Sequence, residues 1–186
     1  MTIVPHDGHI NNWLNWSVAE LALTQEENKK EAEWLLSSLL NCSKSELHFQ
    51  EDDLSAQQCT LFQKWINKRL KGEPAQYIAG WTEFYGRRFN VNTAVLIPRP
   101  ETERLVDVAI HTIQELTHPQ IVDIGTGSGC ILLSILKELT NSYGTGIDKS
   151  FKALNMAKKN SRKLNLLQRA KFIHCDVDNF NLDNYD

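Results

Sequence analysis

The stretch "IVDIGTGSGC", residues 121–130, decides how the second half of this chain is built. An apolar run, residues 121–124, is followed at once by three glycines that alternate with Thr126 and Ser128. A short apolar run bounded by glycines is typical of a strand, and residues 128–139 are expected to form a helix. The glycines therefore predict a strand-to-helix loop whose backbone can approach a ligand closely.

Outward from this loop, the chain alternates between strands and helices. Each expected strand is short and apolar, and Ser150 is the expected N-cap of the second helix. Alternation of this kind predicts βαβ units, a parallel sheet and right-handed crossovers. The expected strands are residues 120–124, 143–148 and 170–175.

The N-terminal part of the chain has the pattern of helices. Two capping boxes mark helix starts, Thr24 with Glu27 and Ser55 with Gln58. Apolar residues at helical spacing follow both of them, which predicts helices that pack on one another. Four tryptophans of this part are expected to lie in the helix core: Trp13, Trp16, Trp34 and Trp65.

A change of pattern between Gln76 and Pro98 separates the helical part from the sheet. Aromatic and β-branched residues there, interrupted by glycines, predict a β-hairpin or short strands. The helix expected next has an inner face of Leu105, Val106, Ala109, Ile110 and Ile113. The expected domains are a helical domain at residues 1–74, a hairpin linker at residues 75–100 and a partial sheet domain at residues 101–186.

The composition is that of a globular protein. The 186 residues are 41% hydrophobic and 23% charged with a formal net charge of −3, which indicates neither a nucleic-acid-binding nor a membrane-binding surface. The sequence has no secretory signal, no Arg-rich transit sequence and no apolar block that would span a bilayer. The four cysteines form no Cys-x-x-Cys pair and are expected to be reduced and mostly buried. We expect a soluble, cytoplasmic protein without a metal site.

The spacing of the glycines separates the candidate ligands. A P-loop needs Lys and then Ser or Thr after its last glycine, but Cys130 and Ile131 stand there. A dinucleotide fingerprint needs a glycine at position 130, whereas the third glycine here is Gly129. Asp123, two residues before the first glycine, is a further candidate for the site. A tight turn without any ligand is the alternative interpretation of the loop alone.

Acidic residues also lie where the second and third expected strands end. Asp148 lies about twenty residues past the loop, where a carboxylate can accept both hydroxyls of a ribose. Asp176 can accept from an adenine amino group, and Val177 can pack on the ring. Parallel strands bring their carboxyl ends to one edge of the sheet, so these residues are expected to share a site. The candidate cofactor-binding residues are Gly125, Thr126, Gly127, Ser128, Gly129, Asp148, Asp176 and Val177.

This arrangement resembles motif I and the following motifs of the Rossmann-like S-adenosylmethionine-dependent methyltransferases. The segments "GEPAQYIAG" (72–80), "EFYGRRF" (83–89) and "LIPRPETE" (96–103) narrow the resemblance to the HemK/PrmC protein-glutamine methyltransferases. The resemblance implies an α/β fold with an N-terminal helical domain for substrate recognition, a β-hairpin linker and the first half of a methyltransferase sheet. It also implies S-adenosylmethionine as the cofactor.

The family resemblance implies substrates as well. Members of this family methylate the side-chain amide of the glutamine in the Gly-Gly-Gln motif of peptide-chain release factors, and a sister branch methylates a ribosomal protein. We therefore expect a release factor as partner, with no direct nucleic acid and no membrane. Arg99 and Glu103 would lie around the methionine end of the cofactor or fix the linker, and a structural salt link is the alternative.

The catalytic signature of the family, Asn-Pro-Pro-Tyr, does not occur in the 186 residues. We expect it to lie beyond Asp186, which leaves no catalytic residue to name and predicts that this chain alone cannot transfer a methyl group. A methyltransferase acting on the amino group of a nucleic-acid base shares the loop and the signature, and stays an alternative. A non-enzymatic binding module is a second one.

Overall fold

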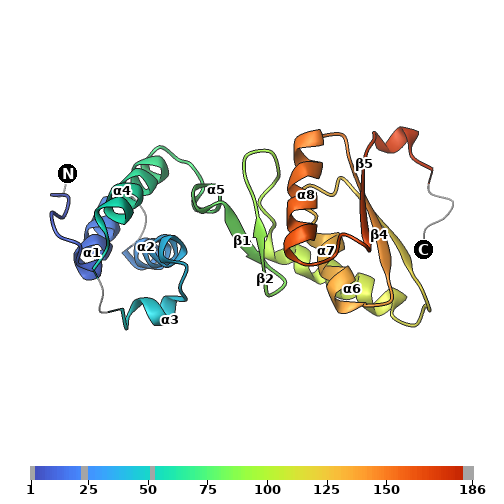
Figure 1. The fold of residues 1–186 in the computed structure, drawn as a ribbon, viewed down its shortest axis with the longest axis horizontal. Helices are drawn as coiled ribbons and strands as arrows, with labels where there is room; N and C mark the ends of the chain where they lie inside the picture. The colour runs from blue at the N-terminus through green and yellow to red at the C-terminus, as the bar shows by residue number, and fades with distance from the viewer. Residues whose placement is uncertain (1–2, 22–24, 51–52, 182–186) are drawn as a thin grey trace. The chain divides into compact units, whose positions relative to one another are not determined.

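The computed structural model describes residues 3–21, 25–50 and 53–181. Contacts divide the chain into two compact units, residues 1–79 and residues 80–186 (Figure 1). The first unit is helical, and the second combines a small antiparallel sheet with a parallel sheet and its helices. None of the helices in these described ranges is long and apolar enough to cross a membrane.

The helical unit begins its helices at polar caps. Ser55 accepts from the backbone N–H of Gln58, whose side chain accepts from the backbone N–H of Ser55, so this expected capping box is confirmed. Ser43 and Glu46 form a second capping box that the sequence analysis missed. The box expected at Thr24 lies outside the described residues. The helices are α1 (Ile10–Glu20), α2 (Gln25–Leu40), α3 (Lys44–Leu47), α4 (Ala56–Leu70) and α5 (Ala75–Ala79).

Aromatic rings and leucines form the core of the helical unit. Trp13 meets Trp16 and Phe62 edge-on, with ring centroids 5.4 and 6.3 Å apart. Trp34 and Trp65 are half-buried against the same core, so the expected packing of the four tryptophans is confirmed. Such edge-to-face aromatic pairs stabilise the fold beyond the free energy of burial.

A hairpin opens the second unit. Its strands, β1 (Trp81–Phe84) and β2 (Arg87–Asn90), pair antiparallel and confirm the expected hairpin. Tyr85 and Gly86 form the two-residue turn with φ of 51° and 65°, as a turn that matches the twist of the strands requires. The segment expected to be extended from Gln76 starts instead with α5, because its first residues complete the helical unit.

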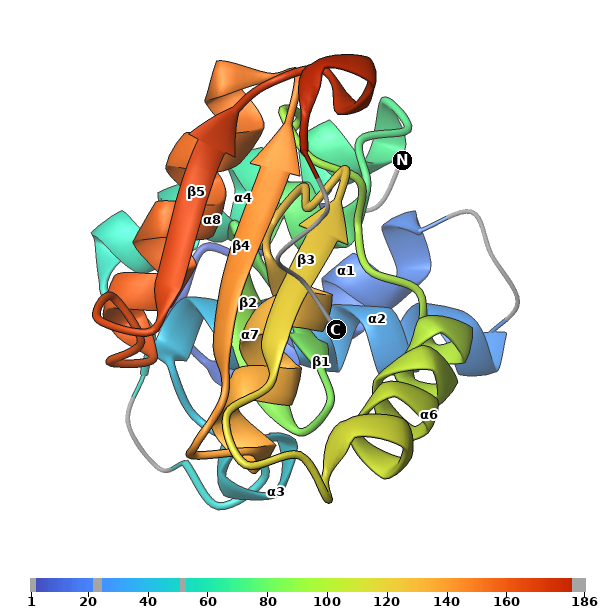
Figure 2. The same cartoon turned by 90° about the vertical axis from the view of Figure 1, so that its right-hand side faces the viewer.

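The parallel sheet has the order β3-β4-β5, with strands β3 (Gln120–Ile124), β4 (Tyr143–Asp148) and β5 (Ala170–His174). The connecting helices α7 (Cys130–Glu138) and α8 (Phe151–Lys163) cover the same face of the sheet (Figure 2). Gly144 of β4 allows α7 to approach, since a Cβ there would lie 2.4 Å from Leu132 Cδ1. The expected α/β fold class is confirmed. Short 3-10 turns are η1 (Pro100–Thr102) and η2 (Val177–Asn179).

Two expectations about burial are wrong. Helix α6 (Glu103–Ile113) buries Val106 fully, but Leu105 is 53% exposed. Adjacent residues of a helix point about 100° apart, and the stripe that packs on the core is centred on Val106. Of the four cysteines, all free, only Cys130 is buried. The other three are half-buried, since Cys42 and Cys59 lie at the edge of the helical core and Cys175 follows the last residue of β5.

Candidate cofactor site

The glycine loop between β3 and α7 has a backbone shape that only glycine adopts readily at three places. Gly125, Gly127 and Gly129 have φ of 71°, 54° and 78°. The backbone N–H groups of Gly125 and Thr126 both donate to the carbonyl oxygen of Ile147, each at 2.9 Å. The loop therefore continues the pairing of β3 with β4 beyond the end of the strand.

Asp148 at the tip of β4 holds the loop through its carboxylate. One carboxylate oxygen accepts from the backbone N–H of Gly127 at 3.0 Å, and the other accepts from that of Ser150 at 2.8 Å. An ionised carboxylate offers about four acceptor positions. Two of them are used by the backbone, which leaves two for hydroxyl groups of a ligand.

Asp123 is tied to the other side of the loop. The hydroxyl of Thr126 donates to its Oδ2 at 2.7 Å. Burial raises the pKa of the Asp123 carboxyl, and the nearby Asp148 carboxylate raises it further. Burial also raises the pKa of the Cys130 thiol to about 11, which keeps the thiol protonated and unreactive near neutral pH.

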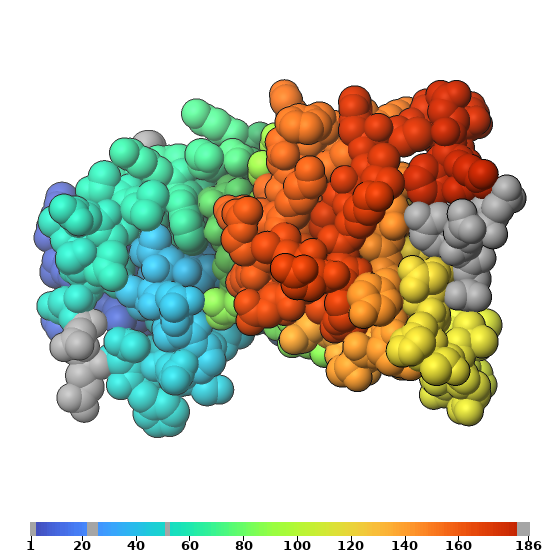
Figure 3. Space-filling model, turned by 45° about the vertical axis from the view of Figure 1, so that its right-hand side comes forward, coloured from blue at the N-terminus to red at the C-terminus, as the bar shows by residue number. Residues whose placement is uncertain are grey.

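A cavity of about 400 Å³ lies at the carboxyl ends of the three strands. Four of the expected site residues line it, namely Gly125, Asp148, Asp176 and Val177. The segment after β5 that carries the last two lies at the surface (Figure 3). The remaining expected residues of the loop shape the backbone behind the cavity, and the roles of all of them toward a cofactor stay predictions.

Four further residues, not expected from the sequence, line the cavity: Ile124, Ile147, Lys149 and Cys175. Each of the four directly neighbours a residue at a strand tip. Ile124 is 49% exposed although it is apolar. An apolar residue immediately before the first glycine was the available signal, since the last side chain of a strand reaches the same edge as the loop.

The lining of this cavity fits an adenosine group. Ile124 and Val177 offer apolar surface for the faces of a ring, and Asp148 and Asp176 offer acceptors for hydroxyl and amino groups. The volume lies within the range of about 300 to 1,000 Å³ that is typical of small-molecule sites. The cavity therefore combines an open glycine backbone, two free acceptor positions on Asp148 and an apolar wall.

Arg99 and Glu103 lie outside the cavity at the strand ends. The side chain of Glu103 accepts from the backbone N–H of Tyr85 at 2.8 Å, which ties α6 to the turn of the hairpin. Arg99 is exposed and precedes the 3-10 turn η1. Neither residue lines the cavity at the strand ends, and their expected roles near the cofactor stay predictions.

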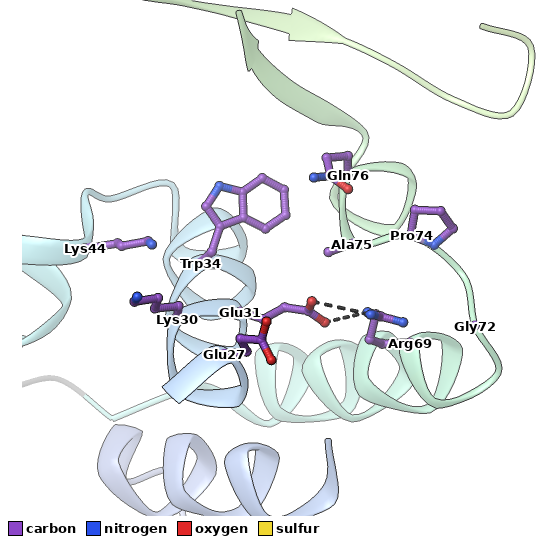
Figure 4. A pocket seen from close by; sticks show the side chains of 10 residues that line it. All are labelled: Glu27, Lys30, Glu31, Trp34, Lys44, Arg69, Gly72, Pro74, Ala75 and Gln76. Atoms are coloured by element: carbon purple, nitrogen blue, oxygen red, sulfur yellow. Dashed lines mark hydrogen bonds and ion pairs between the residues drawn. The ribbon is translucent and has the colours of Figure 1, made fainter. Parts of the chain in front are cut away.

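A second cavity, of about 620 Å³, lies within the helical unit. Its wall carries an ion pair in which Arg69 Nε lies 2.5 Å from Glu31 Oε1. Trp34 and Glu31 project into it from α2, and Ala75 and Gln76 come from α5 (Figure 4). The cavity combines an indole ring with charges of both signs.

Comparison with known proteins divides the chain in the same way. Residues 12–80 match the PrmC N-terminal domain, and residues 117–186 match a methyltransferase domain. The chain carries a PrmC N-terminal domain and a methyltransferase domain. The expected resemblance to the HemK/PrmC methyltransferases is thereby confirmed, and the methyltransferase match supports S-adenosylmethionine as the cofactor.

Curated relatives agree with the domain matches. The release factor glutamine methyltransferase of Koribacter versatilis is 42% identical over 134 residues, which are 72% of this chain and 48% of that protein. Its counterpart from Chlorobaculum tepidum is 35% identical over 177 residues, 87% of this chain and 60% of that protein. The chain thus spans about half the length of these relatives. A solved methyltransferase from Geobacter sulfurreducens is similar over 46% of this chain and 32% of its own, with 27% identity and a TM-score of 0.39.

Proposed function

We propose that this chain forms the cofactor-binding and substrate-recognition parts of an S-adenosylmethionine-dependent methyltransferase that acts on a glutamine of a peptide-chain release factor. The observation that carries the proposal is the position of Asp148. Its carboxylate is fixed by the loop backbone at Gly127 and lines the same cavity as Gly125, Asp176 and Val177. Such preorganised acceptors bind a ligand without further ordering.

In the proposed complex each residue of the cavity has one task. Asp148 accepts from the hydroxyls of the ribose, and Asp176 accepts from the adenine amino group. Val177 and Ile124 cover the ring, and Gly125 lets the backbone approach the remainder of the cofactor. When bound, the cofactor supplies an activated methyl group on a sulfonium. The residues of this chain therefore hold and orient the donor.

The proposed acceptor is the side-chain amide of the glutamine in a Gly-Gly-Gln motif. The domain match of residues 12–80 and the similarity to release factor glutamine methyltransferases support a release factor. We propose that the helical unit contacts it, and that the cavity around Trp34 belongs to this contact surface. A release-factor substrate implies that the protein acts in the cytoplasm.

Cofactor binding is tested by isothermal titration of S-adenosylhomocysteine into the 186-residue chain. The titration should give binding that Asp148→Asn weakens and that Asp178→Asn leaves unchanged. Asp178 lies in the turn η2 and does not line the cavity, so it is a matched control for removal of a carboxylate. Absence of binding to the folded wild-type chain would contradict the proposed cofactor site.

The substrate class is tested by titrating three macromolecules into the same chain. A release factor with an intact Gly-Gly-Gln motif should bind, and Trp34→Ala should weaken that binding. Binding of a ribosomal protein alone would favour the sister activity. Binding of RNA or DNA alone, with a strong dependence on salt, would favour a base methyltransferase.

We also propose that these 186 residues alone do not transfer the methyl group, since they contain no Asn-Pro-Pro-Tyr. An amide nitrogen is a poor nucleophile because its lone pair is delocalised, and transfer needs acceptors that orient it. Incubation of the chain with methyl-labelled cofactor and a release factor should therefore leave the release factor unlabelled. Labelling above the background of a cofactor-only control would contradict this.

A further inference from the structure

Asn160 is a polar residue among the buried residues of α8, where it is 1% exposed. The primary amide of Asn has two N–H donors and an oxygen with two lone pairs. All four are used here. The oxygen accepts from the backbone N–H and from Nδ2 of Asn90, both at 2.8 Å. The nitrogen donates to the carbonyl oxygens of Asn90 and Ser128, at 3.0 and 2.9 Å.

These four bonds join two segments that are far apart in sequence. Asn90 is the last residue of β2, and the amide of Asn160 pairs with both its backbone N–H and its C=O, as a neighbouring strand would. Ser128 belongs to the glycine loop. The end of the hairpin and the loop are therefore held by one side chain, which has no hydrogen-bonding capacity left over.

The same face of α8 also limits the space beside the loop. A Cβ on Gly129 would lie 3.2 Å from the Cβ of Ala157, one helical turn before Asn160. The first half of the loop is held from elsewhere, at Thr126 by Asp123 and at Gly127 by Asp148. Among these side-chain contacts, only Asn160 ties the loop to the hairpin.

We infer that Asn160 is a positioning residue that holds the second half of the glycine loop in its cofactor-binding shape by fixing it to the end of the hairpin. The reference to a cofactor rests on the proposed function above. Asn160 does not line the cavity at the strand ends and acts through the backbone of the loop. A buried amide with four good partners is rigid, because loss of any partner leaves a buried polar group unpaired.

Two substitutions compare the loss of all four bonds with the loss of one hairpin bond. Asn160→Leu removes all four hydrogen bonds at similar side-chain size. Asn90→Ala removes only the bond from Nδ2 and leaves the two backbone bonds and the bond to Ser128. A third variant, Val106→Ala, destabilises the same unit from α6, where Val106 is fully buried, and controls for loss of stability alone.

The first measurement is amide hydrogen exchange in the 186-residue chain at Gly127 and Gly129. Their N–H groups donate to Asp148 and to the carbonyl oxygen of Thr126, so their protection reports the shape of the loop. The second is the affinity for S-adenosylhomocysteine. Asn160→Leu should accelerate exchange at Gly129 more than at Gly127, whose N–H donates to Asp148. It should weaken binding by about tenfold or more, as expected for the loss of one or two net hydrogen bonds.

The controls should differ from Asn160→Leu in both measurements. Asn90→Ala should change the affinity by less than about threefold, and Val106→Ala should change global stability without a selective effect on the two loop amides. Equal loop exchange in Asn160→Leu and Val106→Ala would overturn the inference. If Asn160→Leu does not fold, Asn160→Ser removes the bond to Ser128 with a smaller side chain and is judged in the same way.

The two proposals fail in different ways. If the folded wild-type chain does not bind S-adenosylhomocysteine while loop exchange responds to Asn160→Leu as expected, the proposed function fails and the positioning role stands. If the wild type binds and Asn160→Leu binds equally with unchanged loop exchange, the positioning role fails and the cofactor site stands.

Discussion

Gly129→Ala tests whether the glycine loop is required for packing as well as for conformation. Gly129 has φ of 78°, a region that costs a residue with a Cβ about 1 to 2 kcal/mol. The new Cβ would also lie 3.1 Å from Leu133 Cδ1 and 3.2 Å from Ala157 Cβ. The leucine side chain can move its end, but the alanine is part of α8 and moves only with the helix. Overpacking of this kind costs about 1 to 3 kcal/mol, so the total loss of stability is about 2 to 5 kcal/mol.

Gly125→Ala is the matched control in the same loop. Its φ of 71° is nearly the same, but a Cβ there meets no atom within 4 Å. The expected loss is therefore the backbone contribution alone, about 1 to 2 kcal/mol. Gly125 lines the cavity at the strand ends, so its new methyl group should instead weaken binding of S-adenosylhomocysteine.

The assay is urea denaturation followed by far-UV circular dichroism, combined with calorimetric titration of S-adenosylhomocysteine. Stability should fall more for Gly129→Ala than for Gly125→Ala, by the free energy of the clash with α8. At temperatures where both variants are folded, affinity should fall more for Gly125→Ala. Equal losses of stability in the two variants would refute the packing argument, because the two positions differ in their neighbours and hardly in φ.

Three further predictions concern side chains of the second unit. Asp148→Asn should weaken cofactor binding in a titration by about tenfold to 150-fold, since a charge-assisted hydrogen bond contributes about 1.5 to 3 kcal/mol; an unchanged affinity would contradict the role of this carboxylate. Burial raises the pKa of Asp123, so the unfolded state releases this proton at lower pH than the folded state does. The stability of the wild type relative to Asp123→Asn should therefore fall as pH rises from the ordinary pKa of 3.8 to the folded-state pKa. Urea denaturation of both proteins between acid and neutral pH measures this difference, and a difference that grows with pH would contradict the raised pKa. The phenol of Tyr85 donates to Asp107 at 2.7 Å, which raises its pKa to about 12; ultraviolet titration should show this ionisation, and Asp107→Asn should lower its pKa toward the usual value of about 10.

Local patterns of the sequence were sufficient for most elements of the second unit. The strands expected at residues 120–124 and 143–148 are β3 and β4 with the same bounds. Strands that alternate with helices and are bounded by glycines and helix caps can be recognised from a few neighbouring residues. Ser150 caps α8 as expected. Leu105 was expected to be buried but is exposed. Helical periodicity identifies the apolar face of a helix but not which side of that face packs against the core.

The candidate site was predictable only in part. Asp148, Asp176 and Val177 could be predicted from their positions in the sequence after the glycine loop, since the carboxyl ends of parallel strands lie at the same edge of the sheet. Ile124 and Lys149 were missed although they adjoin the predicted residues. Asn160 was not predicted at all, because the role of a buried polar residue in a helix can be inferred only when its hydrogen-bond partners are known.

The sequence by itself determined the order of helices and strands, the glycine loop and the family resemblance, because helix caps, apolar periodicity and motif spacing are local properties. The tertiary structure decided which residues of those elements contact one another. It assigned two backbone donors to Asp148, brought Ala157 against Gly129 and gave Asn160 its four partners on Asn90 and Ser128. These contacts join residues up to 70 positions apart, and hydrogen bonds of a buried amide depend on distances that only the packed fold sets.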